Sequence, residues 1–479
     1  MNAIETDYLI IGAGACALAF ADTLLESAPG AHLTLVDRHG APGGHWNDAY
    51  PFVTLHQPSA YYGVPSLPLG SGRIDTHGLN EGYHELASGA EVCAHFVQAM
   101  HERLLPSGRV AYRPMCEYLG PTDGDAGPMH RFASLLSGEE TQVHVRRKVV
   151  DATYLGTAVP ATHRPQFAVA PGVRLEPPGA LPHLWRERAP RPEGFVVLGA
   201  GKTAMDAVVW LQQCGAAPAS IAWVRPRDSW LIDRGTTQPG VEFFQASIGA
   251  QADTMEALGQ AADASALFEL LEQRGCMLRI DRAHAPTMFH FATVSRREVD
   301  LLRRVERVIR RGRVRALHAD RIDFSDNSSE PVAPGTLFID CTASAVTRRP
   351  PVPVFQPGRI TLQMVRIPQP TFSASLVAHL EALHDDDALK NKVCAPIPLP
   401  DTLDDYPRAL LVHMRNQHLW NQDAGLRQWI RSSRLDAWGR MIDETDPADA
   451  PKQALLGRMR AASKAAAAAA PRWIGAPTR

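Results

Sequence analysis

The sequence predicts an α/β protein that folds into two lobes, each built on a parallel β-sheet, with a helical region at its C-terminal end. Two observations favour this fold. A short apolar run, a glycine turn, a helical segment and a second apolar run follow one another in residues 8–37, and the same order returns in residues 195–225. The chain of 479 residues, with 45% hydrophobic and 21% charged residues, is long and apolar enough for about three folding units.

The overall charge and the cysteines exclude several classes of protein. The 49 Lys and Arg residues nearly balance the 51 Asp and Glu residues, so we expect no general attraction to nucleic acid. No two of the seven cysteines form a CxxC pair, which argues against a zinc ribbon and a dithiol redox centre. The N-terminal residues lack a basic stretch and the apolar run after them is interrupted by glycines, so we expect a cytoplasmic protein without a membrane partner.

The first glycine turn has the features of a dinucleotide-binding site. Residues 8–11 form an apolar strand, and Gly12-Ala13-Gly14-Ala15-Cys16-Ala17 follows as a GxGxxG motif with Ala in the third position. Gly12 allows the sharp turn, Gly14 lets backbone amides approach a pyrophosphate, and Ala17 is small enough for the helix to pack on the strand. Asp37 ends the second strand, where its carboxylate is expected to accept hydrogen bonds from ribose hydroxyls.

The second glycine turn, Gly199-Ala200-Gly201-Lys202-Thr203-Ala204, repeats this pattern. It also suggests a GxxxxGK[ST] phosphate loop, but the first glycine of that motif would fall on Val196, inside an apolar strand. Where the first lobe has an acid after its second strand, this lobe has Arg225 and Arg227. Arginines there favour NADP(H), because they bind a 2′-phosphate by charge-assisted hydrogen bonds. The alternative is that both arginines belong to a solvated loop.

Two short motifs after Asp37 are candidates for contact with a cofactor ring. In Gly43-Gly44-His45-Trp46 the glycines let the backbone pass close to a ligand, and the indole offers a flat face. In His56-Gln57-Pro58-Ser59 the amide of Gln57 is able to hydrogen-bond the edge of a flavin ring. The alternatives are a surface turn with an incidental Trp for the first motif and a polar turn cap for the second.

Two similar strand ends are predicted to mark the crossings between the lobes, one outward and one back. They are Val149-Val150-Asp151-Ala152-Thr153 and Phe338-Ile339-Asp340-Cys341-Thr342-Ala343. Their small residues would let a cofactor pass closely, and generic buried strand ends are the competing interpretation. The 19 histidines show no metal-ligand spacing and the sequence has no GxSxG motif, so we expect the chemistry to come from bound cofactors.

The remaining segments are expected to complete the lobes. We predict helices at 90–104, 241–275 and 298–311, strands at 109–118, 143–150 and 336–340, a turn at 120–128 and an ordered proline-rich linker at 160–192. Residues 465–470 are six alanines, which favour helix intrinsically. For this end of the chain we expect a frayed terminal helix followed by a loose tail.

Taken together, these motifs resemble the flavoproteins with two dinucleotide-binding domains, and within them the flavin-containing and Baeyer–Villiger monooxygenases. The resemblance rests on the two GxGxxA turns, Asp37, the Gly-Gly-x-Trp motif, the arginines of the second lobe and the Asp-Ala-Thr/Asp-Cys-Thr pair. Residues 43–46, 56–63 and 199–206 are most similar to a bacterial subgroup called FAD/NAD(P)-binding oxidoreductases. The resemblance covers about residues 4–395.

The resemblance implies two Rossmann-like dinucleotide-binding domains, the FAD domain being interrupted by the NADP domain. It places the first part of the FAD domain at 1–160 and its second part at 336–395. The NADP domain is expected at 190–335, with a helical insertion at about 241–290, and a helical C-terminal region at 396–479.

The resemblance also implies an enzyme that uses FAD and NADPH, and most closely a single-component monooxygenase. Such an enzyme forms a flavin (hydro)peroxide from O2 and transfers oxygen to a small molecule. Gln57 is the candidate catalytic residue. The residues expected to bind FAD or to lie beside it are Gly12, Gly14, Ala17, Asp37, Arg38, Gly44, Trp46, His56, Gln57 and Thr153. Those expected to bind NADPH or to line its passage are Gly199, Gly201, Lys202, Thr203, Arg225, Arg227, Asp340 and Thr342.

Two alternatives stay open. The monooxygenase fingerprint FxGxxxHxxx(F/Y) is approximated by Tyr154-Leu155-Gly156, His163 and Phe167, with three additional residues before the histidine. An NADPH oxidase or acceptor reductase is therefore an alternative enzyme. A flavin-binding redox sensor without turnover is the alternative of a different class.

Overall fold

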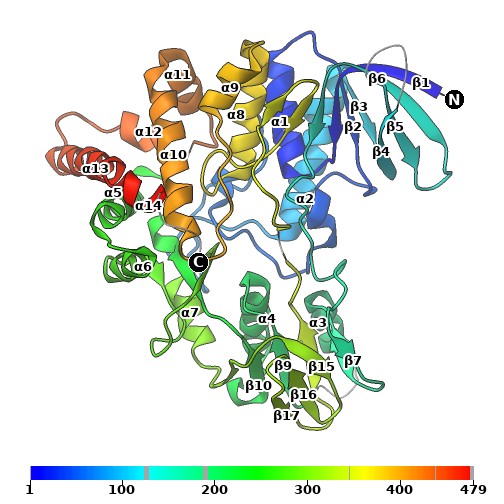
Figure 1. Ribbon diagram of the computed structural model, residues 1–479, viewed down its shortest axis with the longest axis vertical. Helices are drawn as coiled ribbons and strands as arrows, with labels where there is room; N and C mark the ends of the chain where they lie inside the picture. Colours follow the sequence, from blue (N-terminus) through cyan, green and yellow to red (C-terminus); the bar gives the residue numbers. More distant parts are fainter. Residues whose placement is uncertain (1, 123–128, 187–191, 345, 437, 475–479) are drawn as a thin grey trace.

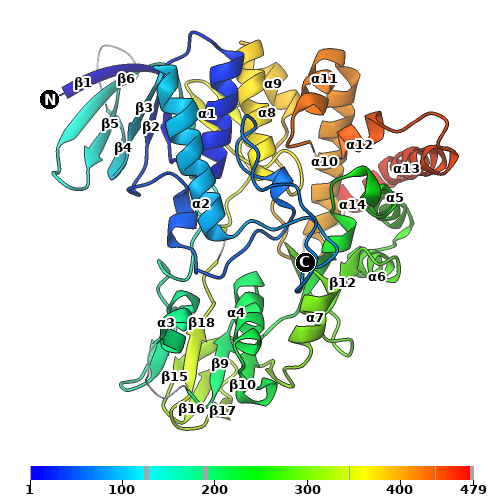
Figure 2. The same ribbon diagram turned by 180° about the vertical axis from the view of Figure 1, so that it is seen from behind.

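The computed structural model describes residues 2–122, 129–186, 192–344, 346–436 and 438–474. The chain forms two lobes, the first at the top and the second at the bottom of Figure 1, with a group of helices beside them. Figure 2 shows the same arrangement from behind. Each lobe contains a largely parallel sheet, so the α/β fold with two lobes predicted from the repeated strand–turn–helix pattern is confirmed.

The sheet of the first lobe has the strand order β19-β20-β6-β1-β2-β3, and β4 and β5 extend it beside β6. Its strands are β1 (Asn2–Ile11), β2 (Leu33–Val36), β3 (Val110–Arg113), β4 (Cys116–Thr122), β5 (Met129–Ser134), β6 (Glu140–Asp151), β19 (Phe355–Gln356) and β20 (Arg359–Thr361). Tyr8 and Ile10 pack toward α1 (Ala15–Ser27) and α8 (Pro370–Leu383), whereas Leu9 packs in the cluster on the β4-β5 side. Because both faces are covered, β1 is a continuous apolar run from Tyr8 onward rather than an alternating one.

The sheet of the second lobe is entirely parallel, in the order β14-β10-β9-β18-β8. Its strands are β8 (Arg174–Glu176), β9 (Phe195–Leu198), β10 (Ile221–Val224), β14 (Arg307–Ile309) and β18 (Leu337–Asp340). One face packs against α3 (Leu181–Arg186), α4 (Lys202–Gln213) and α7 (Arg296–Leu302). The other face packs against a smaller sheet of β7 (Ala168–Val169), β15 (Val314–Leu317), β16 (Arg321–Phe324) and β17 (Ser329–Pro331).

The chain crosses between the lobes at the two similar strand ends, as predicted. It leaves the first sheet at the end of β6, and it returns after β18 to form β20 beside β6. The boundaries predicted for the second lobe are nevertheless wrong. Strand β18 pairs with β9 and is fully buried, so residues 337–340 belong to the second lobe and the return begins after them. The predicted linker 160–192 supplies β7, β8 and α3 to the same lobe.

Three local predictions are corrected by tertiary packing. The basic helix predicted at 298–311 ends at Leu302, because residues 307–309 form β14 and pair with β10. The strand predicted at 109–118 divides into β3 and β4 near Met115, which has a positive φ of 52°. In the predicted turn at 120–128, the first three residues belong to β4, and residues 123–128 lie outside the described part of the chain.

The insertion of the second lobe and the C-terminal region are largely helical, as predicted. The insertion contains α5 (Phe244–Gln260) and α6 (Ala264–Gln273), and also β12 (Met277–Leu278), which forms a small sheet with β11 (Ser229–Asp233) and β13 (Met288–Val294). The remaining helices are α2 (Gly89–Gln98), α9 (Asp387–Val393), α10 (Asp405–Gln422), α11 (Ala424–Ser432), α12 (Gly439–Asp443), α13 (Ala450–Ala468) and α14 (Ala470–Ile474). Among the helices described, none is long and apolar enough to cross a membrane.

The alanine-rich end is packed rather than frayed, which corrects the prediction of a loose tail through residue 474. Helix α13 lies beside α5 in both views of Figures 1 and 2. Ala466 is fully buried, and a Cβ added to Gly259 would lie 3.4 Å from the Ala466 nitrogen. The indole of Trp473 donates a hydrogen bond to the Leu258 carbonyl at 3.2 Å. Small side chains thus let the two helix backbones approach closely.

This packing predicts different effects for neighbouring substitutions in α13. Ala466→Leu adds volume at the contact with α5 and should lower the free energy of unfolding by about 1–3 kcal/mol, the usual cost of overpacking. Ala467→Leu adds the same volume on the exposed face and should change it by less than about 0.5 kcal/mol. Urea unfolding of the two variants and the wild type measures the difference, and equal losses would contradict the close helix contact.

Candidate functional site

The first glycine turn presents a helix N-terminus without a side-chain cap. Gly12 has a φ of +100°, and a Cβ there would lie 3.1 Å from the Thr153 methyl carbon. Gly14 is the N-cap of α1, it makes no side-chain cap hydrogen bond, and the first turn of the helix contains no acid. Ala17 is fully buried in the helix behind the turn. Backbone N–H groups at such an end bind anions, so the turn fits a pyrophosphate.

Asp37 lies against this turn, as the motif predicts. One carboxylate oxygen accepts from the Ala13 N–H at 2.5 Å, and the other accepts from the His39 N–H at 2.7 Å. The His39 ring lies 2.8 Å from both Asp37 and Asp48. Burial by itself would lower the pKa of His39, but the bonds to Asp48 and Asp37 outweigh it and raise that pKa above 6.5. Arg38 points outward, with 72% of its side chain exposed.

The Gly43–Trp46 motif packs on the first turn. Gly44 has a φ of +57°, and a Cβ there would come to 2.9 Å from the Gly14 Cα, so the close approach requires glycine. Trp46 lies on the following 3₁₀ turn and its indole donates to the Tyr62 hydroxyl at 2.8 Å. The glycines predicted to pass close to a ligand therefore pass close to the N-terminus of α1.

The second turn is built in the same way. Gly199 has a φ of +124°, and a Cβ there would lie 2.6 Å from the Cys341 carbonyl oxygen. Gly201 is the uncapped N-cap of α4, and a Cβ there would have no neighbour within 4 Å among the described residues. The first glycine of the turn is thus required by the chain itself, whereas open space surrounds the second.

The two crossing segments also share one local structure. In the first, the Asp151 carboxylate accepts from the N–H of Thr153 at 2.9 Å and from its hydroxyl at 2.8 Å. In the second, Asp340 accepts from the N–H of Thr342 at 2.9 Å and from its hydroxyl at 2.6 Å. These turns pack on Gly12 and Gly199 respectively. The structure therefore brings the predicted residues Thr153, Asp340 and Thr342 to the two glycine turns.

A buried cluster of charged side chains, here called the interlobe cluster, joins the lobes beside the second turn. Lys202 forms ion pairs with Asp206 and, at 3.3 Å, with Glu298. Arg234 lies 2.7 Å from Glu298. From the first lobe, the Tyr50 hydroxyl donates to Asp206 at 2.6 Å. Each charge in the cluster has an opposite partner, which is the arrangement that makes buried ions tolerable.

The interlobe cluster reaches the segment that contains His56 and Gln57. Arg234 donates through Nε to the His56 carbonyl at 3.1 Å. Burial, together with the positive charges of Lys202 and Arg234, lowers the pKa of His56 to about 3, so its ring is neutral at ordinary pH. The Gln57 amide donates to the Pro368 carbonyl at 3.2 Å. His56 and Gln57 therefore lie where the two lobes meet.

The ionisations of Glu298 and Tyr50 are equally fixed. Burial would raise the pKa of Glu298, but Lys202 and Arg234 hold it at about 2. Burial raises the pKa of Tyr50 well above 10, and Asp206 adds to the shift. Glu298 is thus a carboxylate and Tyr50 a hydrogen-bond donor across the whole ordinary pH range.

Four members of the interlobe cluster, Tyr50, Asp206, Arg234 and Glu298, are not among the residues that the sequence predicts for the site. Lys202 and Asp206 are spaced i, i+4 on one helix, which is a recognisable ion-pair spacing. Tyr50, Arg234 and Glu298 are distant in sequence and carry no comparable signal.

Of the predicted arginines, Arg225 is 2% exposed and paired with Asp228, whereas Arg227 is exposed.

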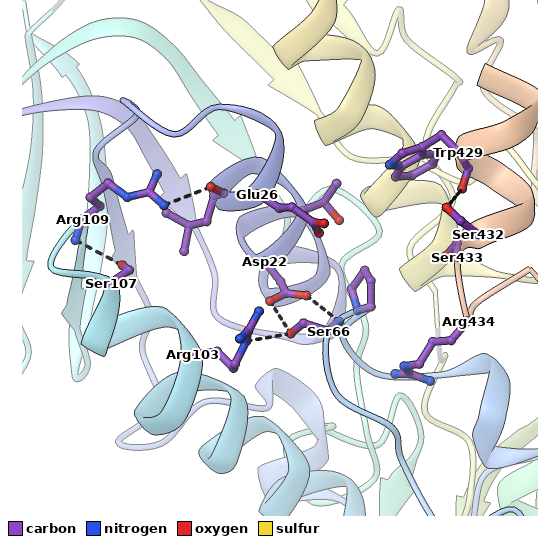
Figure 3. A pocket seen from close by; sticks show the side chains of 13 residues that line it. Asp22, Glu26, Ser66, Arg103, Ser107, Arg109, Trp429, Ser432, Ser433 and Arg434 are labelled. Carbon is purple, nitrogen blue, oxygen red and sulfur yellow. Dashed lines mark hydrogen bonds between the residues drawn. The ribbon is translucent and has the colours of Figure 1, made fainter. Parts of the chain in front are cut away.

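A surface pocket, shown in Figure 3, is lined by Asp22 and Glu26 in the C-terminal half of α1, away from the glycine turn at the start of that helix. Its volume is about 630 Å³, and Asp22, Ser66 and Arg434 are among its lining residues. Asp22 accepts from Ser66, and Arg434 donates to backbone carbonyls of residues 60, 62 and 64, so these polar groups are already used within the chain. Within the described residues, no three His, Cys, Asp or Glu side chains form a group that could hold a metal ion.

Comparison with known proteins gives one domain match and close relatives. Residues 10–62 match the family described as NAD(P)-binding Rossmann-like domain. The chain is 47% identical over 437 residues to "Uncharacterized protein Rv2000" of Mycobacterium tuberculosis and to "Uncharacterized protein Mb2023" of Mycobacterium bovis. Each alignment covers 90% of this chain and 78% of the relative, and so includes both lobes.

Solved structures with a similar fold include two monooxygenases. The flavin-containing monooxygenase from Stenotrophomonas maltophilia is 14% identical with a TM-score of 0.46, covering 80% of this chain and 98% of that one. A closed crystal structure of cyclohexanone monooxygenase is 12% identical with a TM-score of 0.48, covering 79% and 85%.

The second turn predicts separate effects for its two glycines. Gly199→Ala places a Cβ on the Cys341 carbonyl at positive φ and should lower the free energy of unfolding by about 1–3 kcal/mol. Gly201→Ala meets no neighbour and should cost less than about 1 kcal/mol, the effect of Ala at a helix N-cap. The added methyl should nevertheless weaken binding of NADPH, the dinucleotide that the sequence predicts for this turn. Thermal unfolding and titration calorimetry measure the two effects, and full NADPH affinity in Gly201→Ala would contradict this use of the turn.

Proposed function

We propose that this chain, which belongs to the family of the mycobacterial proteins Rv2000 and Mb2023, is an FAD- and NADPH-dependent oxidoreductase. More specifically, we propose a single-component monooxygenase that uses O2 on a small molecule. The observation that carries this proposal is the pair of glycine turns, each at an uncapped helix N-terminus and each packed on an Asp-x-Thr crossing turn. Two such turns in one chain supply one site for a flavin dinucleotide and one for a nicotinamide dinucleotide.

The first turn is the proposed FAD site. Gly12, Gly14 and Ala17 would hold the pyrophosphate at the N-terminus of α1. Asp37 already accepts from Ala13 and His39, but a carboxylate has about four acceptor positions, so ribose hydroxyls would still find a partner. When bound, FAD supplies the acceptor for hydride and the reaction with O2.

Trp46, His56 and Gln57 lie on the segments that connect the first turn to the interlobe cluster, and we assign them to the surroundings of the flavin ring. The Trp46 indole is fixed by its bond to Tyr62, so its ring is held in one orientation. The neutral ring of His56 brings no positive charge to this region. Gln57 would orient the flavin through its side-chain amide.

The second turn is the proposed NADPH site. Gly199, Gly201 and Thr203 would hold the pyrophosphate at the N-terminus of α4, and the exposed Arg227 would attract the 2′-phosphate. The ammonium group of Lys202 is held by Asp206 and Glu298, so we assign it a positioning role rather than direct phosphate contact. Its neighbour Gly201 leaves space for the dinucleotide itself.

The interlobe cluster is proposed to hold the lobes so that nicotinamide and flavin can meet. His56, Glu298 and Tyr50 keep their protonation states, because the pKa of His56 is about 3, that of Glu298 about 2 and that of Tyr50 well above 10. These three groups therefore exchange no protons between about pH 5 and pH 9.

The proposal predicts a yellow protein whose flavin is reduced anaerobically by NADPH. When ¹⁸O2 is then admitted in the presence of a panel of thioethers, amines and ketones, at least one product should carry one ¹⁸O atom, detected by mass spectrometry. The same incubations report the ratio of hydrogen peroxide released to NADPH consumed. A coupled monooxygenase should release well under one equivalent with its substrate.

Each other outcome has a defined meaning. A colourless protein that does not take up added FAD would refute the flavoprotein assignment. Reduction by NADPH followed by one full equivalent of hydrogen peroxide with every compound would favour the oxidase alternative. Bound flavin that neither NADPH nor NADH reduces would favour a redox sensor without turnover.

A further inference from the structure

Arg225, the first residue after β10, is buried in a second group of charges that the proposed function does not use. Only 2% of Arg225 is exposed, and its guanidinium lies 4.5 Å above the ring of Trp223. Its Nε is 2.7 Å from the Asp228 carboxylate. Asp228 also pairs with Arg310 at 3.1 Å, and Arg310 in turn pairs with Asp281 at 2.7 Å.

This group contains more hydrogen-bond donors than it uses. Nη1 of Arg225 and Nε of Arg310 are buried without a hydrogen-bond acceptor, whereas Nε of Arg225 is ion-paired with Asp228 at 2.7 Å. Each guanidinium has five N–H donors, and one shared carboxylate cannot satisfy all of them. Burial lowers the pKa of Arg225, which Asp228 only partly opposes, so the arginine is poorly solvated as it stands.

The place of the group in the fold indicates which anion would serve these arginines better. In a dinucleotide-binding βαβ unit, the residue after the second strand lies beside the ribose 2′ position. The Gly199 N–H bonds the carbonyl of Val224, which directly precedes Arg225, so the glycine turn and the arginine are adjacent. A phosphate offers three oxygens to a guanidinium fork, against two from a carboxylate.

We propose that Asp228 determines nicotinamide specificity by occupying the arginines that a 2′-phosphate would use. This inference rests on the proposed function of the second turn as an NAD(P)H site. With Asp228 and Asp281 present, the two arginines and two carboxylates carry no net charge, and the donors that they leave unused are buried, so we expect a 2′-phosphate to gain these donors by displacing Asp228. NADPH binding then exchanges one anion for another, and the preference of the wild type for NADPH over NADH is correspondingly small.

The test compares two ligands that differ only in the 2′-phosphate, namely adenosine 2′,5′-bisphosphate and 5′-AMP. Asp228→Asn keeps the shape of the side chain and removes its charge. Titration calorimetry should show at least about tenfold tighter binding of the bisphosphate and less than about twofold change for 5′-AMP, because the freed donors meet only the 2′-phosphate.

The matched control is Asp281→Asn, which removes the same charge from the same group but leaves Asp228 on Arg225. Its bisphosphate affinity should rise by less than about threefold. Asp228→Ser, which opens more space, gives a second measurement should the amide variant fold poorly. Equal effects at positions 228 and 281, or no gain in either position-228 variant, would overturn the proposal.

The outcomes separate this inference from the function on which it rests. If the wild type binds NADPH and NADH while the position-228 variants leave their ratio unchanged, the role of Asp228 is refuted and the nicotinamide site stands. If the wild type binds neither dinucleotide nor either adenosine phosphate, both are refuted together.

Discussion

The interlobe cluster is the constraint on which the rest of the site depends. Lys202, Asp206, Glu298 and Arg234 are buried charges, and removing one partner of such a group leaves an uncompensated ion at a cost of about 3–5 kcal/mol. Arg234 and Tyr50 extend the group into the first lobe through hydrogen bonds to His56 and Asp206. The lobes cannot separate or rotate here without breaking these two hydrogen bonds. The second glycine turn, which directly precedes Lys202, is therefore held in a fixed position relative to the His56–Gln57 segment.

Much of the fold follows from the sequence because its signals are local. A buried parallel strand, a glycine turn and a small residue in the next helix are close in the chain, so both βαβ units are predicted correctly. The failures are tertiary. Residues 307–309 leave the predicted helix because β10 offers them a strand partner, and the alanine-rich end is ordered because α5 covers it. Neither partner is visible from the local pattern.

The candidate site shows the same division. Gly12, Gly14 and Asp37 come together as their spacing predicts, since one turn and one strand end place them. Arg225 also lies where its spacing predicts, beside the second turn, but its surroundings do not follow from that spacing. Its carboxylate partner Asp228 is only three residues away in sequence, but Arg310, which shares this carboxylate, and Asp281, which pairs with Arg310, are brought there by the path of the chain. Sequence thus predicts position along a strand better than it predicts charge balance.

The two glycines of each turn separate the demands of folding from those of binding. Gly12 and Gly199 adopt positive φ and pack on the crossing turns, so the chain needs them whether or not a ligand is present. Gly14 and Gly201 have ordinary extended backbones as helix N-caps, which other residues adopt readily. A Cβ on Gly14 would make only ordinary contacts with Gly44, at 3.6 and 3.9 Å, and a Cβ on Gly201 would have no described neighbour within 4 Å. The packing of the described residues therefore does not require the second glycine of either turn, and the proposed approach of a dinucleotide would give each of them a use in binding.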